Sequence, residues 1–545
     1  MLKHIKNIDA LPVFLALALL FLWSAFPEIR KELVGNKNFR VVNDPVERGV
    51  FIPEQGEISE GGIRNYNTAL DLFYSLDGGE NFMLAEQDQI ELAEVENPSI
   101  LYQNTSIRWR HPKGEFPVLK AIMVKWQDQR NHTETKPKAV TYFNQDLGPY
   151  PVVSIQLPQS DFLSYENGIM VYGEQGTQDK GFQKDWWYRS ANFASRGYEW
   201  GREVAFQYFE NNELKAESKC EMRISGNATR YFPQKSLKFF PLAENGKRSK
   251  LAYPFWADQG NKKSSSFLLR NSGNDNSKTM FADLFMQNLV KNCNVLTQAG
   301  KPVSVFVNGN YWGVYNLRER VDRYYVAKKE GVKDKDVTLL YCEVYGDRTR
   351  LKSGSKKDKA AFDALIAELP EGDLSDEQYA ALKKEISFKS FIDYILIETF
   401  FANQDWLHNN VTWYKAGDKK WKWLVNDLDY SLAYPGETNL NANLFDRLGK
   451  SQAITAQLFN VLMTHKKFKQ KFKERAHELL SETFSYQRIE AVYNPIKEHY
   501  SQGIDTQIRR WRFITSKAQW EKDCEKNVTF LRNRRTLFIE QVESL

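Results

Sequence analysis

The segments NQDWLHNN (residues 403–410) and WKWLVNDLDY (residues 421–430) decide how this chain is interpreted. Asp405 and Asn410 stand five positions apart in the first segment, and Asp427 and Asp429 follow a short predicted strand pair in the second. Carboxylate and amide oxygens are the ligands that hard divalent cations prefer. The order aspartate, asparagine, strand pair, aspartate therefore predicts a site that combines a positioned carboxylate with a metal ion.

The spacing of Asp405 and Asn410 is also that of the aspartate and asparagine in the catalytic loop HRDxxxxN of protein kinases. Phosphoryl transfer needs a carboxylate that orients the attacking hydroxyl, a neutral oxygen ligand for a metal ion and a further carboxylate on the metal. We therefore expect Asp405 to be catalytic and Asn410, Asp427 and Asp429 to bind magnesium. Alone, Asp405 would fit a helix cap equally well, because aspartate is favoured there.

A lysine on a strand is expected to hold the phosphates of the nucleotide. Lys235, in QKSLKFF (residues 234–240), is our first candidate. Strand alternation puts Lys235 and Lys238 on opposite faces, and apolar residues accompany both, so Lys238 remains an alternative. Arg230 would supply a second cation. Asp283, which opens the helical segment MFADLF, is the expected partner of the lysine, although ordinary kinases use glutamate there.

The sequence contains fewer motifs that indicate which residues bind the nucleotide base. No GxGxxG or GxxxxGK[ST] loop is present, which excludes an ordinary kinase or a P-loop enzyme. SGNATR (residues 225–230) is either a cover for the phosphates or a plain hairpin turn. The candidates for stacking on adenine are Tyr315 and either Trp421 or Trp423, although such aromatic residues usually belong to a core. Glu319 is expected to meet the ribose or a backbone amide.

Strand and helix patterns are distributed unevenly along the chain. Short alternating segments dominate up to residue 240, VSVFVNGNYWGVYNL predicts a hairpin at Asn308 and Gly309, and helical spacing prevails beyond residue 358. QLFNVLMTHKKFKQKFKERAHELL, near the C-terminus, predicts an amphipathic helix. We therefore expect an α+β fold: a two-lobed, atypical kinase-like domain over residues 157–545, with a β-rich N-lobe and a helical C-lobe.

A separate small all-β sandwich is expected over residues 41–148. NTALDLFYSLDGGENF alternates apolar and polar residues before a turn at Asp77, Gly78 and Gly79, and further strand-length runs follow. The segment contains no cluster of acid, base or nucleophile. It is expected to act as a spacer or to contact a glycan or a protein.

Residues 1–28 are expected to be a signal peptide or a membrane anchor. Lys3 and Lys6 precede the apolar run LPVFLALALLFLWSAF (residues 11–26), as in export signals. The run is slightly short for a comfortable membrane span, which needs about 20 residues, and its cleavage pattern is poor. Cleavage and retention both stay open, and either implies an extracytoplasmic protein.

Composition excludes several other classes of protein. A chain of 545 residues is too long for one hydrophobic core, so two or three domains are expected. The net charge of +6, from 75 basic and 69 acidic residues without a basic block, argues against nucleic acid as a partner. The four cysteines show no CxxC spacing and the seven histidines no HExxH, so neither a disulfide scaffold nor a zinc hydrolase is indicated.

Five segments together resemble the CotH (spore coat protein H) family of atypical kinases. They are RISGNATRYFPQKSLKFF (residues 223–240), LLRNSGNDNSKTMFADLF (residues 268–285), VFVNGNYWGVYNLRERVD (residues 305–322) and the two segments quoted first. The resemblance implies ATP, magnesium or manganese, and a Ser or Thr acceptor on an exported or surface protein. The phrases YSLDGG, NTSIRW and TYF resemble the C-terminal module of chitobiases.

Two other functions stay open. Adenylyl transfer on the same scaffold would use most of the same residues, with ATP bound in the opposite sense. A non-catalytic adhesin or surface-assembly protein with a vestigial site is the non-enzymatic alternative, and the complete set of Asp405, Asn410, Asp427 and Asp429 argues against it.

Overall fold

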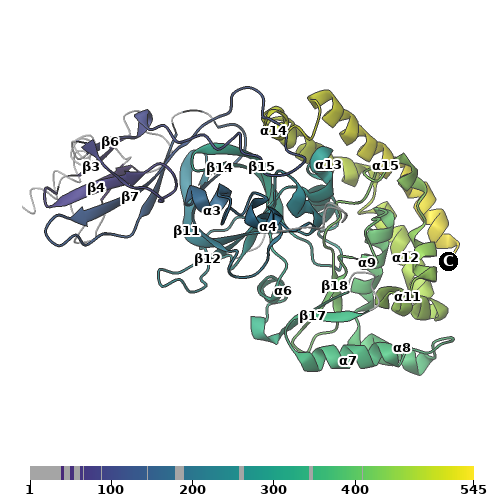
Figure 1. Cartoon of the computed structure of the whole chain (residues 1–545). Helices are drawn as coiled ribbons and strands as arrows, with labels where there is room; N and C mark the ends of the chain where they lie inside the picture. The colour runs from purple at the N-terminus through teal and green to yellow at the C-terminus, as the bar shows by residue number, and fades with distance from the viewer. Residues whose placement is uncertain are drawn as a thin grey trace, which may run out of the picture.

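Figure 1 shows a computed structural model of the chain. It describes residues 39–41, 50–53, 62–65, 67–86, 89–143, 145, 147–177, 189–256, 263–342, 348–407 and 409–545. The predicted export segment lies outside these residues, as does His408. Among the described residues, no helix has both the length and the apolar character needed to cross a membrane.

The N-terminal part contains two four-stranded sheets around one core. Their strands are β1 (Phe39–Val41), β2 (Val50–Pro53), β3 (Gly62–Asn65) and β6 (Gln89–Glu91) in one sheet, and β5 (Met83–Leu84), β4 (Leu70–Ser75), β7 (Lys120–Asp128) and β8 (Lys138–Tyr142) in the other. Ile63, Leu72, Ile90 and Trp126, from both sheets, pack in one buried cluster. The likeness to the chitobiase module stays a prediction.

The turn between β4 and β5 lies where the sequence predicts it. The Asp77 carboxylate accepts hydrogen bonds from the Ser75 hydroxyl and from the backbone N–H groups of Glu80 and Asn81, as turn aspartates commonly do. Gly78 has φ +81°, and a Cβ there would lie 1.7 Å from the Leu157 carbonyl oxygen. Only glycine therefore allows this turn to approach the next part of the chain.

Seven strands form a closed barrel in the middle of the chain (Figure 1). In sheet order they are β10 (Arg202–Glu210), β11 (Glu213–Ile224), β12 (Leu237–Pro241), β13 (Phe267–Arg270), β15 (Asn310–Glu319), β14 (Gly300–Val307) and β9 (Val152–Gln156). The pairs are antiparallel except β14 with β9. The predicted hairpin at Asn308 and Gly309 joins β14 to β15. The barrel takes in β9, which precedes the expected domain start at Leu157.

Strand alternation gives the barrel an apolar interior and a polar outer face. Leu237 and Phe239 of β12, Leu269 of β13 and Leu317 of β15 are buried in the interior cluster. Their neighbours along the strands, among them Lys238, therefore point outward, because successive side chains of a strand face opposite sides. The outer face is the one that carries the candidate site.

Beyond the barrel lies a region that combines a further four-stranded sheet with helices. Its sheet has the order β17 (Thr349–Ser353), β16 (Val337–Cys342), β18 (Thr412–Ala416) and β19 (Lys422–Leu424). The α-helices of the described chain are α3 (Gln159–Leu163), α4 (Gly173–Thr177), α5 (Ala282–Leu289), α6 (Arg323–Glu330), α7 (Lys356–Ala367), α8 (Asp376–Glu385), α9 (Phe388–Phe400), α10 (Leu444–Lys450), α11 (Ile454–Thr464), α12 (Lys466–Ser481), α13 (Tyr486–Ser501), α14 (Ile504–Trp511) and α15 (Lys517–Glu543).

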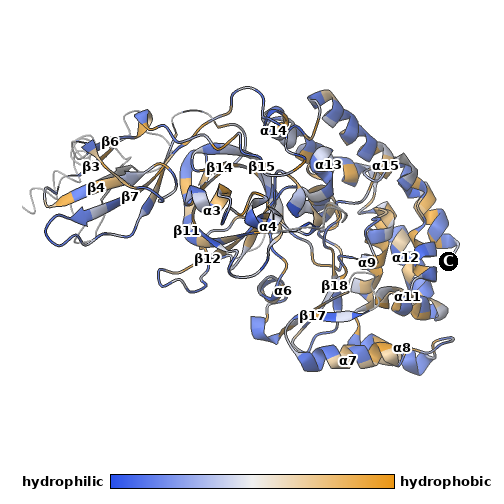
Figure 2. Cartoon of the chain, viewed as in Figure 1, coloured by the Kyte–Doolittle hydropathy of each residue, from blue (hydrophilic) through white to orange (hydrophobic). Residues whose placement is uncertain are grey.

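Two helices show how the sequence shapes this region. Helix α12 buries Phe468, Phe472, Ala476 and Leu479 at helical spacing, which confirms the predicted amphipathic character. The predicted stretch forms two helices, however, because α11 ends just before His465 and α12 begins just after it. Figure 2 shows the mixture of hydrophilic and hydrophobic residues in α12. Helix α9 is buried nearly all round, as expected for its sequence FKSFIDYILIETF. The chain is thus a mixed α+β protein, while the arrangement as two kinase lobes stays a prediction.

The segment between β6 and β7 packs onto the barrel. Ile100 belongs to the barrel's interior cluster, the Thr105 hydroxyl donates to the Pro233 carbonyl, and Asn310 of β15 donates to the Pro98 carbonyl. At the other end of the chain, the Trp511 indole of α14 donates to the Trp312 carbonyl at 2.8 Å. Contacts from both ends of the sequence therefore brace the barrel.

Candidate functional site

The loop after α9 brings Asp405 and Asn410 into direct contact. One oxygen of Asp405, Oδ2, accepts hydrogen bonds from the side-chain amides of Asn409 and Asn410, both at 2.9 Å. The Asp405 backbone N–H donates to Asn403 Oδ1 at 3.2 Å. Asn410 has φ +60°, a conformation that asparagine tolerates better than most residues. The pair selected by its spacing in the sequence is therefore one hydrogen-bonded unit.

Glu398, near the end of α9, is a site residue that the sequence analysis missed. It is 1 % exposed. Asn403 Nδ2 donates to its Oε2 at 2.9 Å and also to the Asp427 carbonyl at 3.4 Å. Burial raises the pKa of Glu398 to about 8, and the charges of Asp427, Asp283 and Asp405 add to the rise. A single acidic residue in the otherwise apolar stretch ILIETF is the signal that would have found it.

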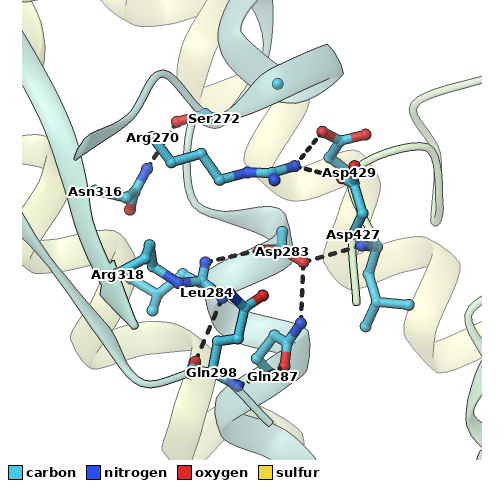
Figure 3. A network of polar contacts seen from close by, with 12 residues as sticks. Arg270, Ser272, Asp283, Leu284, Gln287, Gln298, Asn316, Arg318, Asp427 and Asp429 are labelled. Atoms are coloured by element: carbon cyan, nitrogen blue, oxygen red, sulfur yellow. Dashed lines mark hydrogen bonds and ion pairs between the residues drawn. The ribbon is translucent and has the colours of Figure 1, made fainter. Parts of the chain in front are cut away.

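Asp427 and Asp429 follow β19 and meet Arg270, the last residue of β13 (Figure 3). The Arg270 Nη2 group bonds to Asp427 Oδ1 and to Asp429 Oδ2. Asp427 has φ +59°. Burial raises the pKa of Asp429, the neighbouring Asp427 carboxylate raises it further, and Arg270 opposes the rise. The expected metal-binding aspartates thus lie together, paired with an arginine that the sequence analysis did not select.

Asp429 is also fixed by the turn after β13. The Asn274 backbone N–H donates to Asp429 Oδ2 at 3.1 Å and its side-chain amide to Oδ1 at 2.8 Å. Gly273 has φ +59°, and a Cβ there would lie 1.7 Å from Asp429 Oδ2. Glycine is therefore required for this approach. The side chain of Asp429 is 5 % exposed, against 28 % for Asp427, which makes Asp427 the more accessible ligand.

Asp283 is paired with Arg318, not with a lysine as expected. The Arg318 guanidinium donates to Asp283 Oδ2 at 2.7 Å, and the Leu428 backbone N–H donates to Asp283 Oδ1 at 2.9 Å (Figure 3). Burial would raise the pKa of Asp283, but Arg318 and then Arg270 lower it to about 2. Helix α5 is thereby tied both to β15 and to the segment that carries Asp427 and Asp429.

The hydrogen bonds of the Lys235 side chain go to backbone carbonyls outside this cluster. Strand β12 begins at Leu237, so Lys235 precedes the strand on which it was placed. Its ammonium group is buried and donates to the carbonyls of Thr105, at 2.7 Å, and Phe232, at 2.8 Å. Burial lowers its pKa well below the usual value. Its contacts are those of a residue that holds the N-terminal segment against the barrel.

Lys238 lies on the outer face of the barrel, among other cations. Its pKa is lowered to about 8, first by burial and then by Arg320, Arg230, Arg223 and Arg196. Over the described ranges, no hydrogen bond or ion pair engages its ammonium group. Of the two lysines that the sequence left open, Lys238 is the one that shares the outer face with Arg270.

Arg230, the expected second cation, is 4 % exposed. Its guanidinium donates to four backbone carbonyls, those of Gly226, Phe193, Ser195 and Ile224. These bonds hold the turn over residues 225–230 in place. Arg230 therefore contributes positive charge to the outer face, while its donors are already used.

The aromatic residues expected to stack on a base lie in hydrophobic cores. Tyr315 is fully buried inside the barrel, and Trp421 and Trp423 are each 1 % exposed. Trp421 packs against Phe362 and Trp423 against Phe391 of α9. Their rings have no open face for a ligand, because strand alternation turns Tyr315 inward and α9 covers Trp423.

Glu319 lies at the edge of a cavity of about 350 Å³. Its Oε2 accepts a hydrogen bond from the backbone N–H of Ala299 at 3.0 Å, and Lys329 lies 3.3 Å away. Arg320, Trp256 and Tyr324 also line the cavity. Lys238 lines a separate, smaller cavity; its pKa is lowered first by burial and then by the charge of Arg320.

Within the described part of the chain, no group of three or more His, Cys, Asp or Glu side chains could hold a metal ion. The site nevertheless joins carboxylates, side-chain amides and cations from distant parts of the sequence. Arg270 and Asp427, for instance, are 157 positions apart. Such a combination suits a ligand that carries both a negative charge and a bound cation.

Comparisons with known proteins agree with this chemistry. A search among curated proteins finds no match. The sequence pattern of the family described as CotH kinase protein matches residues 222–538, which is more than half of the chain and includes the barrel from β11 onward and both carboxylate loops. The chain therefore belongs to the CotH kinase family.

Proposed function

We propose that this protein is a phosphotransferase that uses ATP with magnesium or manganese to phosphorylate Ser or Thr on an exported or surface protein. Membership of the CotH kinase family supports kinase-like activity. The observation that carries the proposal is the convergence of the Asp405–Asn410 pair and the Asp427–Asp429 pair around the buried Glu398.

Asp405 is the proposed catalytic residue. The side-chain amides of Asn409 and Asn410 both donate to its carboxylate and fix its orientation. A charged carboxylate orients the acceptor hydroxyl and accepts its proton as the phosphoryl group is transferred. Asn403, fixed between Glu398 and the Asp427 carbonyl, positions the backbone of this residue.

The residues present fit a magnesium ion. Magnesium in phosphotransfer sites is held by one or two carboxylates, and water and substrate phosphates complete its coordination. Asp427, which is partly exposed, and Asn410 would hold it, while Asp429 supports the segment from its buried position. When bound, the ion would neutralise charge on the phosphates.

Lys238 is the proposed phosphate-binding lysine. Its ammonium group is unengaged among described residues and lies near Arg320 and Arg223, so an anion there would relieve repulsion between like charges. Lys238 itself lines a small cavity of about 80 Å³ together with Arg223 and Arg230. The separate cavity of about 350 Å³, lined by Arg320, is of the size that takes a small ligand, and Trp256 and Tyr324 on its walls are aromatic residues available to a base.

The location and the N-terminal module complete the proposal. The basic and apolar start of the sequence supports export, by way of a cleaved signal or a retained anchor. The two small sheets would act as a spacer or bind a glycan or a protein, as expected for a chitobiase-like module over residues 41–148.

The test is incubation of the purified protein with γ-labelled ATP, magnesium or manganese, and a preparation of exported proteins. Label on a Ser or Thr acceptor is the expected result, and the intact mass of the acceptor separates phosphoryl from adenylyl transfer. Asp427→Ala serves as the matched inactive variant. If neither nucleotide binding nor any modification occurs with either metal, the protein is a non-catalytic surface protein and the proposal is wrong.

A further inference from the structure

The guanidinium of Arg270 lies between the two carboxylates proposed for the metal site. It is the one described donor to the side chain of Asp427, and it also bonds to Asp429 (Figure 3). A guanidinium stays protonated over the whole pH range in which proteins are folded. Arg270 therefore keeps a permanent positive charge at this position.

The backbone around Arg270 fixes its place. It is the last residue of β13 and lies opposite Asn316 of β15 in the antiparallel register. The preceding residue, Leu269, is buried in the barrel, and the turn that follows is held against Asp429 by Asn274. Because the residues on both sides of Arg270 are held in place, the fold fixes where its side chain begins.

The two carboxylates are occupied to different degrees. Asp429 receives three donors, two from Asn274 and one from Arg270, which leaves it little capacity for another cation. Asp427 receives one, and its side chain is partly exposed. Only Asp427 is thus well placed to take a further ligand.

Phosphotransfer sites of the protein-kinase type commonly hold two divalent ions. We propose that Arg270 takes the place of one of these ions, so that the site binds a single divalent cation, at Asp427, and does so only together with the nucleotide. This inference rests on the proposed function and specifies its metal requirement.

The physical reason is charge balance. A divalent cation at both carboxylates would lie directly beside a guanidinium that cannot lose its proton, and like charges at such short range repel strongly. The phosphates of a nucleotide add negative charge, which offsets this repulsion for one ion. Without nucleotide, the positive charge of Arg270 already neutralises one of the two negative charges of the carboxylates, so the attraction for a divalent cation is weaker.

Counting bound Mn²⁺ tests the proposal without any activity measurement. Electron paramagnetic resonance of free Mn²⁺ during titration is expected to give one bound ion per wild-type protein with a non-hydrolysable ATP analogue, and none at the same concentrations with Mn²⁺ alone. In Arg270→Gln, Mn²⁺ alone is expected to bind at least about tenfold more tightly than in the wild type, and a second ion to bind with the analogue.

Two further variants control for charge and folding. Arg248→Gln removes an arginine of the barrel that pairs with Glu221 instead, and should behave as the wild type. Arg270→Lys keeps the charge and should still exclude the second ion, which remains informative if Arg270→Gln does not fold. Two ions bound to the wild-type complex, or tight Mn²⁺ binding without nucleotide, would overturn the inference and leave the proposed function standing. A wild-type protein that binds no analogue at all would overturn both.

Discussion

The outer face of the barrel and the loops of the helix-rich region carry opposite charges. On the barrel, Lys238 lies among Arg320, Arg230 and Arg223, and burial lowers its pKa further. In the loops, Asp405 is held by neutral amides, and Glu398 lies buried among three carboxylates. Arg270 crosses from one region to the other.

This difference suits different chemical roles for the two regions. Cations on rigid strands suit the recognition of phosphate, and carboxylates on loops after α9 and β19 suit metal binding and proton transfer. The two regions therefore offer complementary groups, cations around Lys238 on the barrel and carboxylates in the loops. The predictions below alter one region at a time.

The largest effect is expected from Asp405→Asn. The side chain keeps its size but loses its charge and its capacity to accept a proton, so transfer should fall by roughly two to four orders of magnitude. Nucleotide and metal should still bind, because Asp427 and Lys238 are unchanged. Single-turnover transfer and equilibrium binding of a fluorescent ATP analogue measure the two properties separately.

Asn410→Ala provides the matched comparison within the same loop. It removes a proposed metal ligand and also the 2.9 Å bond to Asp405, so a higher metal requirement and weaker nucleotide binding are expected together with slower transfer. Near-normal transfer in Asp405→Asn combined with complete loss in Asn410→Ala would show that the kinase-like spacing is a coincidence.

The next effect concerns the two lysines. Lys238→Met should weaken nucleotide binding by roughly tenfold to a hundredfold and leave the free energy of unfolding unchanged or slightly higher, because a cation is removed from among other cations. Lys235→Met should leave nucleotide binding unchanged and lower the free energy of unfolding. It leaves the Thr105 and Phe232 carbonyls without their donor, which costs about 1–3 kcal/mol of stability.

Binding titrations and chemical denaturation of both lysine variants measure this contrast. If Lys235→Met is fully stable but binds nucleotide more weakly, then Lys235, and not Lys238, is the lysine that binds the phosphates.

The smallest effect is a pH dependence of stability that arises from Glu398. Its pKa is raised from 4.5 to about 8 in the folded protein, so the folded state keeps a proton that the unfolded chain releases. The contribution of this bound proton to the free energy of unfolding is fully present below about pH 4.5 and is lost as the pH rises through about 8.

Glu398→Gln is permanently neutral and should lack this dependence. Between about pH 5 and pH 8 the wild type should lose roughly 2–4 kcal/mol relative to the variant, because one pKa unit corresponds to about 1.4 kcal/mol. Denaturant unfolding at both pH values measures the difference. Parallel pH profiles for the two proteins would show that Glu398 is ionised in the fold.

Much of the fold follows from local patterns that the sequence displays. The Asp77 turn, the Asn308–Gly309 hairpin and helix α12 lie where turn residues and apolar spacing predict them. The contact between Asp405 and Asn410 belongs to the same class, because five residues of loop keep the two side chains near each other. The chemical roles of these residues stay predictions.

The errors concern residues whose environment depends on distant parts of the chain. The sequence names Tyr315 and either Trp421 or Trp423 as candidates for stacking on a base, but all three are buried in hydrophobic cores. Asp283 was paired with a lysine, but β15 supplies Arg318, 35 positions away. Lys235 is buried like Leu237 and Phe239, but it precedes the strand, and its donors go to two backbone carbonyls that the sequence does not identify.

The sequence by itself determined the α+β class, the family and the identity of four candidate side chains, Asp405, Asn410, Asp427 and Asp429. These depend on composition, short-range spacing and the order of motifs. Only the tertiary structure decided that Lys235 is buried while Lys238 lies on the outer face of the barrel, that Arg270 joins the two aspartates, and that Glu398 is buried beside them. These contacts join segments as much as 157 positions apart, and strand register and helix packing, which no local pattern encodes, bring such segments together.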